Sequence, residues 1–270
     1  MTKSITTALT RAGAAAIAAF ALIGMLSGTA AAENAEIAKL RAAERKTFTD
    51  REIISGFLQI TFGAELHIAG RADRIRKFDR PVRIYIDNRA KSDRGEQVAA
   101  VIADIASRIQ NLDIAITDKR KEANLVVTLI LDRDLPRTVR ALSGPILPQQ
   151  IQRSLQPRCL SEIRKDKSFR IVRSDAILVT DAGEFVFYDC AYEEILQALG
   201  PINDDSAVPW TMFNDDVQKG FFDIYDQYLL NILYDRRIRP GMTQSEVRAV
   251  LPQVLADVRA WVAKVNKLPR

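Results

Sequence analysis

The residues with the clearest chemical potential lie close together in the second half of the chain. Glu193 and Glu194 are adjacent, and Gln197 stands four positions after Glu193. In a helix, residues four apart share a face, so Glu193 and Gln197 point the same way, with Glu194 beside them. In a zinc enzyme such a face holds the metal while a carboxylate deprotonates its water. The spacing therefore makes Glu193 and Glu194 candidate catalytic residues.

The same residues also fit a structural interpretation, in which they form the polar face of a helix whose Ile195, Leu196 and Leu199 are core. Carboxylate and amide groups make a poor zinc site, because zinc prefers His nitrogen and Cys sulfur. The chain holds one His, His67, and two Cys, which excludes three-His zinc, Cys-rich zinc and iron–sulfur sites. We therefore expect no zinc here.

The first 32 residues have the layout of a secretory signal peptide. Lys3 and Arg11 supply positive charge, residues 14–26 form an apolar run, and Ala30-Ala31-Ala32 offers a small-residue cleavage site. The apolar run is shorter than the roughly 20 residues that a membrane span needs. We expect the signal peptide, residues 1–32, to be removed, the protein to be periplasmic or secreted, and no transmembrane anchor to remain.

Export would place Cys159 and Cys190 in an oxidising compartment. Two cysteines without a third competitor most simply pair, so we expect a disulfide, with two buried free thiols as the alternative. A nucleophilic cysteine is disfavoured, because nothing in the sequence pairs His67 with either sulfur.

Two similar tripeptides, Asn203-Asp204-Asp205 and Asn214-Asp215-Asp216, stand on either side of Met212. Calcium takes six to eight oxygens from carboxylates, amides and carbonyls in loops, so these six residues are candidate calcium ligands. Capping is the commoner use of Asn and Asp. The second tripeptide would then cap the next helix, and Asp204 or Asp205 would close an Asx-turn. We expect no cofactor other than calcium.

Charge is distributed unevenly along the chain, whose formal net charge is +5. Nine basic and four acidic side chains lie between Arg71 and Arg94, whereas residues 181–226 carry eleven acidic residues and one basic residue, Lys219. The basic stretch suits acidic polymers or lipid headgroups, and the exported location disfavours nucleic acid. Alternatively, it is a solvated surface whose charges partly pair with the acidic half.

Hydrophobic periodicity predicts an α/β (α+β) fold around these residues. Helices are expected at 33–46, from the capping box Thr49-x-x-Glu52, at 93–112, at 190–199 with Asp189 as its cap, at 222–235, and from the capping box Thr243-x-x-Glu246. Strands are expected at 82–87, 114–117, 125–131 and 170–180. The connection 136–157 is long enough for a binding loop or lid. An N-terminal helical extension, 33–61, would precede one domain, 62–270.

The segment from Glu193 to Asn203 has the spacing of the metzincin zinc-peptidase signature H-E-x-x-H-x-x-G-x-x-H. Glu193, Gln197 and Asn203 stand at its His positions, Glu194 at the general base and Gly200 at its glycine. Residues 210–214, around Met212, resemble the Met-turn of those enzymes, and residues 226–234 resemble the helix that follows it. This resemblance implies a zincin-like fold, with a mixed sheet, a signature helix and a helical C-terminal part, that lacks the zinc-binding His residues.

The chain more closely resembles a family of bacterial exported proteins known as domain of unknown function 2927. The resemblance covers roughly residues 62–251. Its motifs are Asp189-Cys190-x-x-Glu193-Glu194-x-x-Gln197-x-Leu199-Gly200, Phe213-Asn214-Asp215 and Leu233-Tyr234-Asp235-x-Arg237-x-Arg239-Pro240-Gly241-Met242.

These features predict an exported pseudo-metallopeptidase that binds a cell-envelope ligand or protein. Its pseudo-site would comprise the metzincin-spaced residues Glu193, Glu194, Gln197, Gly200, Asn203 and Met212. One alternative is an atypical, zinc-independent hydrolase of cell-envelope material that uses Glu193 and Glu194. Adjacent helix residues diverge by about 100°, so that mechanism needs a carboxylate from elsewhere. Another alternative is a structural or assembly factor of the envelope. The ligand and the oligomeric state stay open.

Overall fold

The computed structural model describes residues 33–62, 73–143, 159–201, 203–214 and 216–269. They belong to one compact unit, Glu33–Arg270. The predicted signal peptide, His67, Asp215 and most of the predicted connection 136–157 lie outside the described residues.

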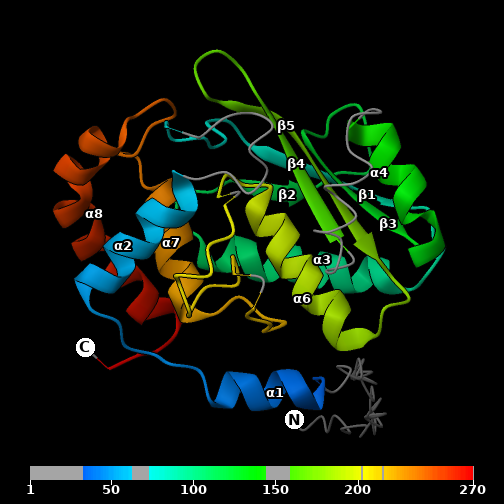
Figure 1. The fold of residues 1–270 in the computed structure, drawn as a ribbon, viewed down its shortest axis with the longest axis horizontal. Helices are drawn as coiled ribbons and strands as arrows, with labels where there is room; N and C mark the ends of the chain where they lie inside the picture. The colour runs from blue at the N-terminus through cyan, green and yellow to red at the C-terminus, as the bar shows by residue number, and fades with distance from the viewer. Residues whose placement is uncertain (1–32, 63–72, 144–158, 202, 215, 270) are drawn as a thin grey trace, which may run out of the picture. The chain divides into compact units, whose positions relative to one another are not determined.

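Five strands form one mixed sheet in the order β2-β1-β3-β5-β4 (Figure 1). The strands are β1 (Val82–Asn88), β2 (Ile114–Ile116), β3 (Leu125–Ile130), β4 (Cys159–Lys165) and β5 (Ile171–Val179). All pairings are parallel except that of β4, which runs antiparallel to β5 at the edge. Every residue of β3 is buried, as is typical of a central strand covered on both faces. The α/β class with a mixed sheet is confirmed.

Helices cover both faces of this sheet. Helices α3 (Arg94–Arg108) and α6 (Glu184–Gln197) lie on one face, and α4 (Leu135–Ser143), preceded by the 3-10 turn η2 (Asp132–Asp134), lies on the other (Figure 1). Successive residues of β5 show this division, because Leu178 joins the main core while its neighbour Ile177 joins a smaller cluster with α4.

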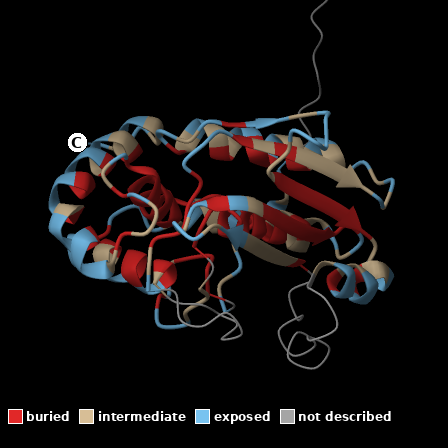
Figure 2. Ribbon diagram, turned by 90° about the horizontal axis from the view of Figure 1, so that it is seen from above, coloured by how far each residue is buried: buried red, intermediate tan, exposed pale blue. Residues whose placement is uncertain are grey.

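A helical layer lies beside the sheet (Figures 1 and 2). It contains α2 (Asp50–Thr61), α7 (Ile224–Tyr234) and α8 (Gln244–Val265), and every residue of α7 is buried. Helix α1 (Ala35–Ala42) contributes Ile37 to the same core that α2 enters through Phe57. The segment 33–61 therefore contributes side chains to the core of the unit, mainly through α2.

Both predicted capping boxes are present. The backbone N–H of Thr49 donates to the Glu52 carboxylate at 2.7 Å, and the Glu52 N–H donates back to the Thr49 hydroxyl at 3.2 Å. Thr243 and Glu246 repeat the arrangement, with distances of 2.7 and 3.3 Å. These bonds satisfy N–H groups that would otherwise lack partners at the starts of α2 and α8.

The predicted start of the signature helix is wrong. Helix α6 begins at Glu184, after Gly183 at a φ of 97°, and Asp189 lies inside it. Phe187 is fully buried, so the added residues 184–189 contribute to the core. Asp189 has the residue type of an N-cap, but its carboxylate accepts hydrogen bonds from the backbone of Lys219 and Gly220.

The predicted long connection begins as a helix. Pro136 occupies the first turn of α4, where its missing N–H removes no bond within the helix. Strand β4 is absent from the predicted elements. Of its residues, Cys159 alone is fully buried, because β4 lies at the edge of the sheet, and its pattern therefore lacks the run of apolar residues seen in β3.

No helix in the described ranges combines the length and the apolar character that a membrane span requires.

The predicted disulfide is confirmed. Cys159 at the start of β4 is bonded to Cys190 of α6, with Cα atoms 5.8 Å apart and a separation of 31 positions in the chain. The bond joins the signature helix to the edge of the sheet.

We predict that Cys190→Ser lowers the free energy of unfolding by roughly 2 to 5 kcal/mol, because the unfolded chain loses a covalent constraint. Urea unfolding of the oxidised protein and of the variant measures the difference. The reduced wild type is the control and should match the variant. Alkylation of both thiols in unreduced, exported protein would contradict the bridge.

Candidate functional site

The candidate site is the second half of α6, which contacts β4 and β5. Glu193, Glu194 and Gln197 are 9%, 5% and 5% exposed. The structural interpretation of the sequence expects a solvated polar face. These three side chains are buried, so they do not form one. Buried polar side chains need partners inside the protein, and these partners define what the site can do.

Gln197 uses both ends of its amide. Its Oε1 accepts a hydrogen bond from the Ser161 hydroxyl of β4 at 3.0 Å, and its Nε2 donates to Asp204 Oδ1 at 2.8 Å. The chain therefore brings Ser161, Gln197 and Asp204 together as one bridge between the edge strand, the helix and the loop after it. Sequence reasoning missed Ser161, because no local pattern links it to Gln197.

Gly200 ends this part of the chain in a tightly packed turn. Its φ is 147°, and a Cβ atom there would lie 2.5 Å from the carbonyl oxygen of Arg76 and 2.9 Å from a methyl of Leu233. A side chain at this position would clash with a neighbouring backbone. The Tyr234 hydroxyl donates to the carbonyl of Leu199 at 2.8 Å, so α7 also holds the turn. The Arg76 side chain is buried, and burial lowers its pKa to about 10.

Met212 and Asn203 have partners of their own. The N–H of Met212 donates to Asp226 Oδ2 of α7 at 2.9 Å, and the Thr211 hydroxyl donates to Asp226 Oδ1 at 2.5 Å. Asn203 donates to the carbonyl of Gln59 in α2 at 3.0 Å. The three residues at the metzincin His positions are therefore in different surroundings: Glu193 and Gln197 are buried along α6, and Asn203 contacts α2.

A buried ion cluster lies next to Met212 and includes Asp226. The Lys219 ammonium contacts the Asp223 carboxylate and lies 3.8 Å from Asp226. Burial disfavours the charged lysine, but Asp223 and Asp226 outweigh it, so the pKa of Lys219 is raised. Burial and the neighbouring Asp223 raise the pKa of Asp226 well above its usual value. Lys219 is the one basic residue between 181 and 226, and this isolation is the sequence signal that could have found it.

Asp189 ties α6 to this cluster. Its Oδ1 accepts hydrogen bonds from the backbone N–H groups of Lys219 at 2.7 Å and Gly220 at 3.0 Å. Burial raises the pKa of Asp189, while the two backbone bonds lower it and only partly offset the burial.

Among the described residues, the acidic tripeptides form hydrogen bonds within loops. Asp205 accepts from the N–H of Ala207 at 2.9 Å, which confirms an Asx-turn, and Asn214 accepts from that of Asp216 at 3.0 Å. The prediction that Asn214 or Asp216 caps the next helix is wrong, because Asp223 caps α7. Outside the undescribed positions, no group of three or more His, Cys, Asp or Glu is placed to hold a metal ion. Calcium binding stays a prediction.

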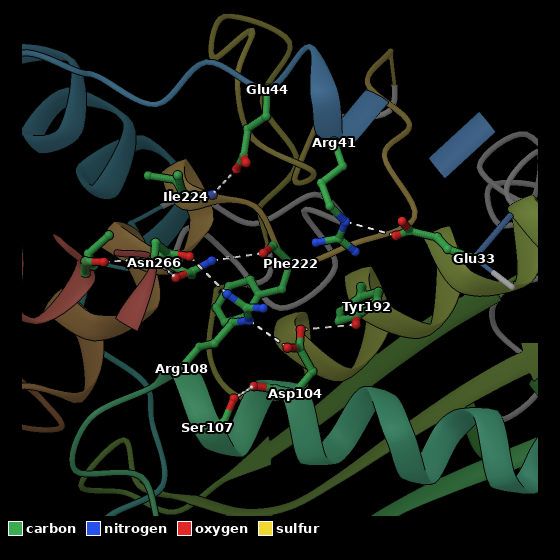
Figure 3. A network of polar contacts seen from close by, with 12 residues as sticks. Glu33, Arg41, Glu44, Asp104, Ser107, Arg108, Tyr192, Phe222, Ile224 and Asn266 are labelled. Carbon is green, nitrogen blue, oxygen red and sulfur yellow. Dashed lines mark hydrogen bonds and ion pairs between the residues drawn. The ribbon is translucent and has the colours of Figure 1, made fainter. Parts of the chain in front are cut away.

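A further polar network holds α6 from the side of α3 (Figure 3). The Tyr192 hydroxyl donates to Asp104 at 3.1 Å, and Arg108 Nε donates to the same carboxylate at 2.6 Å. Arg108 also donates to Asn266 at 3.0 Å, and Asn266 donates to Gln227 of α7 at 2.6 Å. Burial raises the pKa of Tyr192, which keeps its hydroxyl a hydrogen-bond donor. These bonds join α3, α6 and α7 to the end of α8.

The basic stretch 71–94 has local partners. Arg83 pairs with Asp113 at 2.8 Å, and Arg89 pairs with Asp87 at 2.9 Å. Arg94 stacks over the Phe187 ring of α6 at 4.9 Å. These partly exposed pairs contribute little to stability.

We predict that Gln197→Ala lowers the free energy of unfolding by roughly 1 to 3 kcal/mol, because it leaves two partly buried polar partners without their bonds. Gln253→Ala, an exposed position of α8, is the matched control and should change stability by less than about 0.5 kcal/mol. Denaturant unfolding measures both. Equal, small effects would show that the Gln197 bridge is not formed.

We predict that Asp189→Asn gains stability relative to wild type as the pH rises from 4 to 7. The native pKa of Asp189 is raised, so the folded protein holds a proton that the unfolded chain has lost, and the wild type loses stability as the pH rises through this window. Asparagine keeps the accepting oxygen and does not titrate. Urea midpoints of both proteins at the two pH values test this, and a variant that loses stability relative to wild type on the same change would contradict it.

The comparisons with known proteins give one family. Residues 50–253 match the family described as Protein of unknown function (DUF2927). No curated protein matches the chain, and no solved structure matches it. The matched range begins at the first residue of α2 and ends inside α8, so it contains the whole sheet, α6 and the Met212 segment. The chain belongs to the DUF2927 family.

Proposed function

We propose that this protein is exported and acts in the cell envelope by binding a ligand or a protein partner, as a pseudo-metallopeptidase with a zincin-like core. The observation that carries the proposal is the bridge at Gln197. At the helix position where a metzincin has its second zinc ligand, this chain has an amide bonded to Ser161 on one side and Asp204 on the other.

The residues at the site do not fit zinc. Glu193, Gln197 and Asn203 offer one carboxylate and two amides, a donor set that zinc disfavours. The amide oxygen of Gln197, its one group with a lone pair for a metal, already accepts from Ser161. Asn203 donates to Gln59 instead of facing α6. We derive no catalytic step through a metal at these residues.

The order of the elements supports a zincin-like core. After β1 and α3, the remaining four strands come in two pairs separated by α4, and α6 follows them; the Met212 segment and then α7 come after α6. The Met212 segment is tied to α7 through Asp226, which gives it a fixed position next to a buried helix. This order matches the one that the metzincin resemblance implies.

Export is supported by the disulfide. A bond between Cys159 and Cys190 persists in oxidising compartments and is rare in the reducing cytosol. It agrees with the charged and apolar pattern of residues 1–32.

The hydrolase alternative is weaker on the same geometry. Glu193 and Glu194 are buried, and a carboxylate that attacks or protonates a substrate must lie within hydrogen-bond reach of it. Hydrolysis through this pair would require the chain that covers these carboxylates to move away from α6, a helix that Cys190 links covalently to β4. Binding at another surface requires no such movement.

We predict that the purified protein carries no stoichiometric zinc and cleaves no general peptidase substrate, because its donor set is unsuited to zinc. Elemental analysis of protein purified without chelators, together with a labelled casein assay, measures both. One tightly held zinc per chain that is lost in Gln197→Ala and kept in Gln253→Ala would overturn the proposal and favour the hydrolase.

A further inference from the structure

A large groove runs along the last turns of α8. Its volume is about 1410 Å³, and its walls come from the segment between α1 and α2, from α7 and α8, and from the residues after α8. Aromatic side chains line it: Phe48 and Tyr228, which are buried, and Trp261, which is partly exposed. The Trp261 indole N–H donates to the carbonyl of Arg108 at 2.9 Å, which fixes the ring in the wall.

Some charged groups in the groove are already neutralised. Arg259 pairs with Asp50 at 2.5 Å, and Asp235 and Asp257 both pair with Arg237, at 2.7 and 2.6 Å. These groups hold the walls together and have little capacity left for a ligand.

Three lysines in the groove have no acidic partner among the described residues. Lys46, Lys264 and Lys267 line it, are exposed, and make no ion pair in that part of the chain. Lys264 lies over the Trp261 ring, 5.6 Å from its centroid. An unpaired positive surface with aromatic walls attracts a ligand that is both acidic and apolar.

The shape of the wall favours an extended ligand. The lining residues of α8 and of the segment after it run from Asp257 to Pro269. The helical part of this wall, from Asp257 to Lys264, is roughly 10 Å long at about 1.5 Å per residue, which matches about three residues of extended polypeptide at 3.3 Å each. The groove also has side chains that suit peptide groups: those of Thr47 and Gln110 line it and make no hydrogen bond in the described structure. An acyl chain would leave these polar groups without partners.

We propose that this groove binds an extended, acidic segment of a partner polypeptide, with carboxylates at Lys46, Lys264 and Lys267 and apolar side chains against Trp261. The inference rests on the proposed function, since it names the chemistry of the partner. It places that partner on α8, a surface formed by residues other than the pseudo-site.

The test is a fluorescence anisotropy titration of the full exported chain with labelled hexapeptides in which Glu alternates with Leu, Phe or Tyr. A matched set with Lys in place of Glu is the peptide control. The groove variant is Lys46→Glu with Lys267→Glu. Its control is Lys91→Glu with Lys167→Glu, which changes the net charge equally at exposed positions, and Lys91 shares with Lys267 a φ of 53°.

We expect the acidic peptides to bind, the basic set not to bind, and the groove variant to lose at least tenfold in affinity while the control variant keeps wild-type affinity. Added salt should weaken the binding, because exposed charges are screened. Near-ultraviolet circular dichroism checks that both variants fold.

Equal loss in both variants would show a non-specific charge effect and overturn the proposal, as would no binding of the acidic peptides. Binding of phosphatidylglycerol vesicles, but not peptides, that is lost in the groove variant would overturn it in favour of a membrane surface. If zinc-dependent peptidase activity appears, the proposed function fails whatever the peptides do. If the protein is zinc-free and inactive but binds no acidic peptide, this inference alone fails.

Discussion

Helix α6 is buried over its whole second half although it carries several polar and charged side chains, and the packing around it follows from that conflict. A buried polar group without a hydrogen bond is strongly destabilising, so such side chains of α6 form hydrogen bonds with other segments of the chain. Gln197 is hydrogen-bonded to β4 and to Asp204 in the following loop. Asp189 accepts hydrogen bonds from the backbone of Lys219 and Gly220. The disulfide at Cys190 adds a covalent link to β4. Residues far apart in the sequence thereby become fixed neighbours of one helix.

Charged side chains at both ends of the buried helix α7 form hydrogen bonds with its terminal backbone groups. At its start, Asp223 caps the helix, and Glu44, from the segment after α1, accepts from the N–H of Ile224 at 2.6 Å. At its end, the buried Lys77 ammonium donates to the carbonyls of Leu233 at 2.7 Å and Asp235 at 3.1 Å. Negative groups at the start and a positive group at the end both suit the helix dipole. Burial lowers the pKa of Lys77 to about 8, and this bonding explains why a lysine is placed there.

Local signals in the sequence predict much of this fold. The apolar run at β3, the two capping boxes and the pair of cysteines each need only nearby residues or a count, and each prediction is confirmed. The start of α6 and the strand β4 are not predicted, because Asp189 has the residue type of a cap and β4 lies half-exposed at an edge. At the site, the sequence identifies the residues but not their partners. Ser161 lies 36 positions before Gln197, and only the pairing of β4 with β5 brings it there.

The second half of α6 is a permanent part of the interior and does not open as a cleft. Native-state hydrogen exchange of the α6 backbone amides tests this most directly, because it measures the free energy of each opening. We expect the amides between Cys190 and Leu199 to exchange only through global unfolding, with free energies equal to that of the whole domain. Exchange of these amides through a partial opening at much lower free energy, while those of β3 stay protected, would contradict it and would make Glu193 and Glu194 accessible to a substrate.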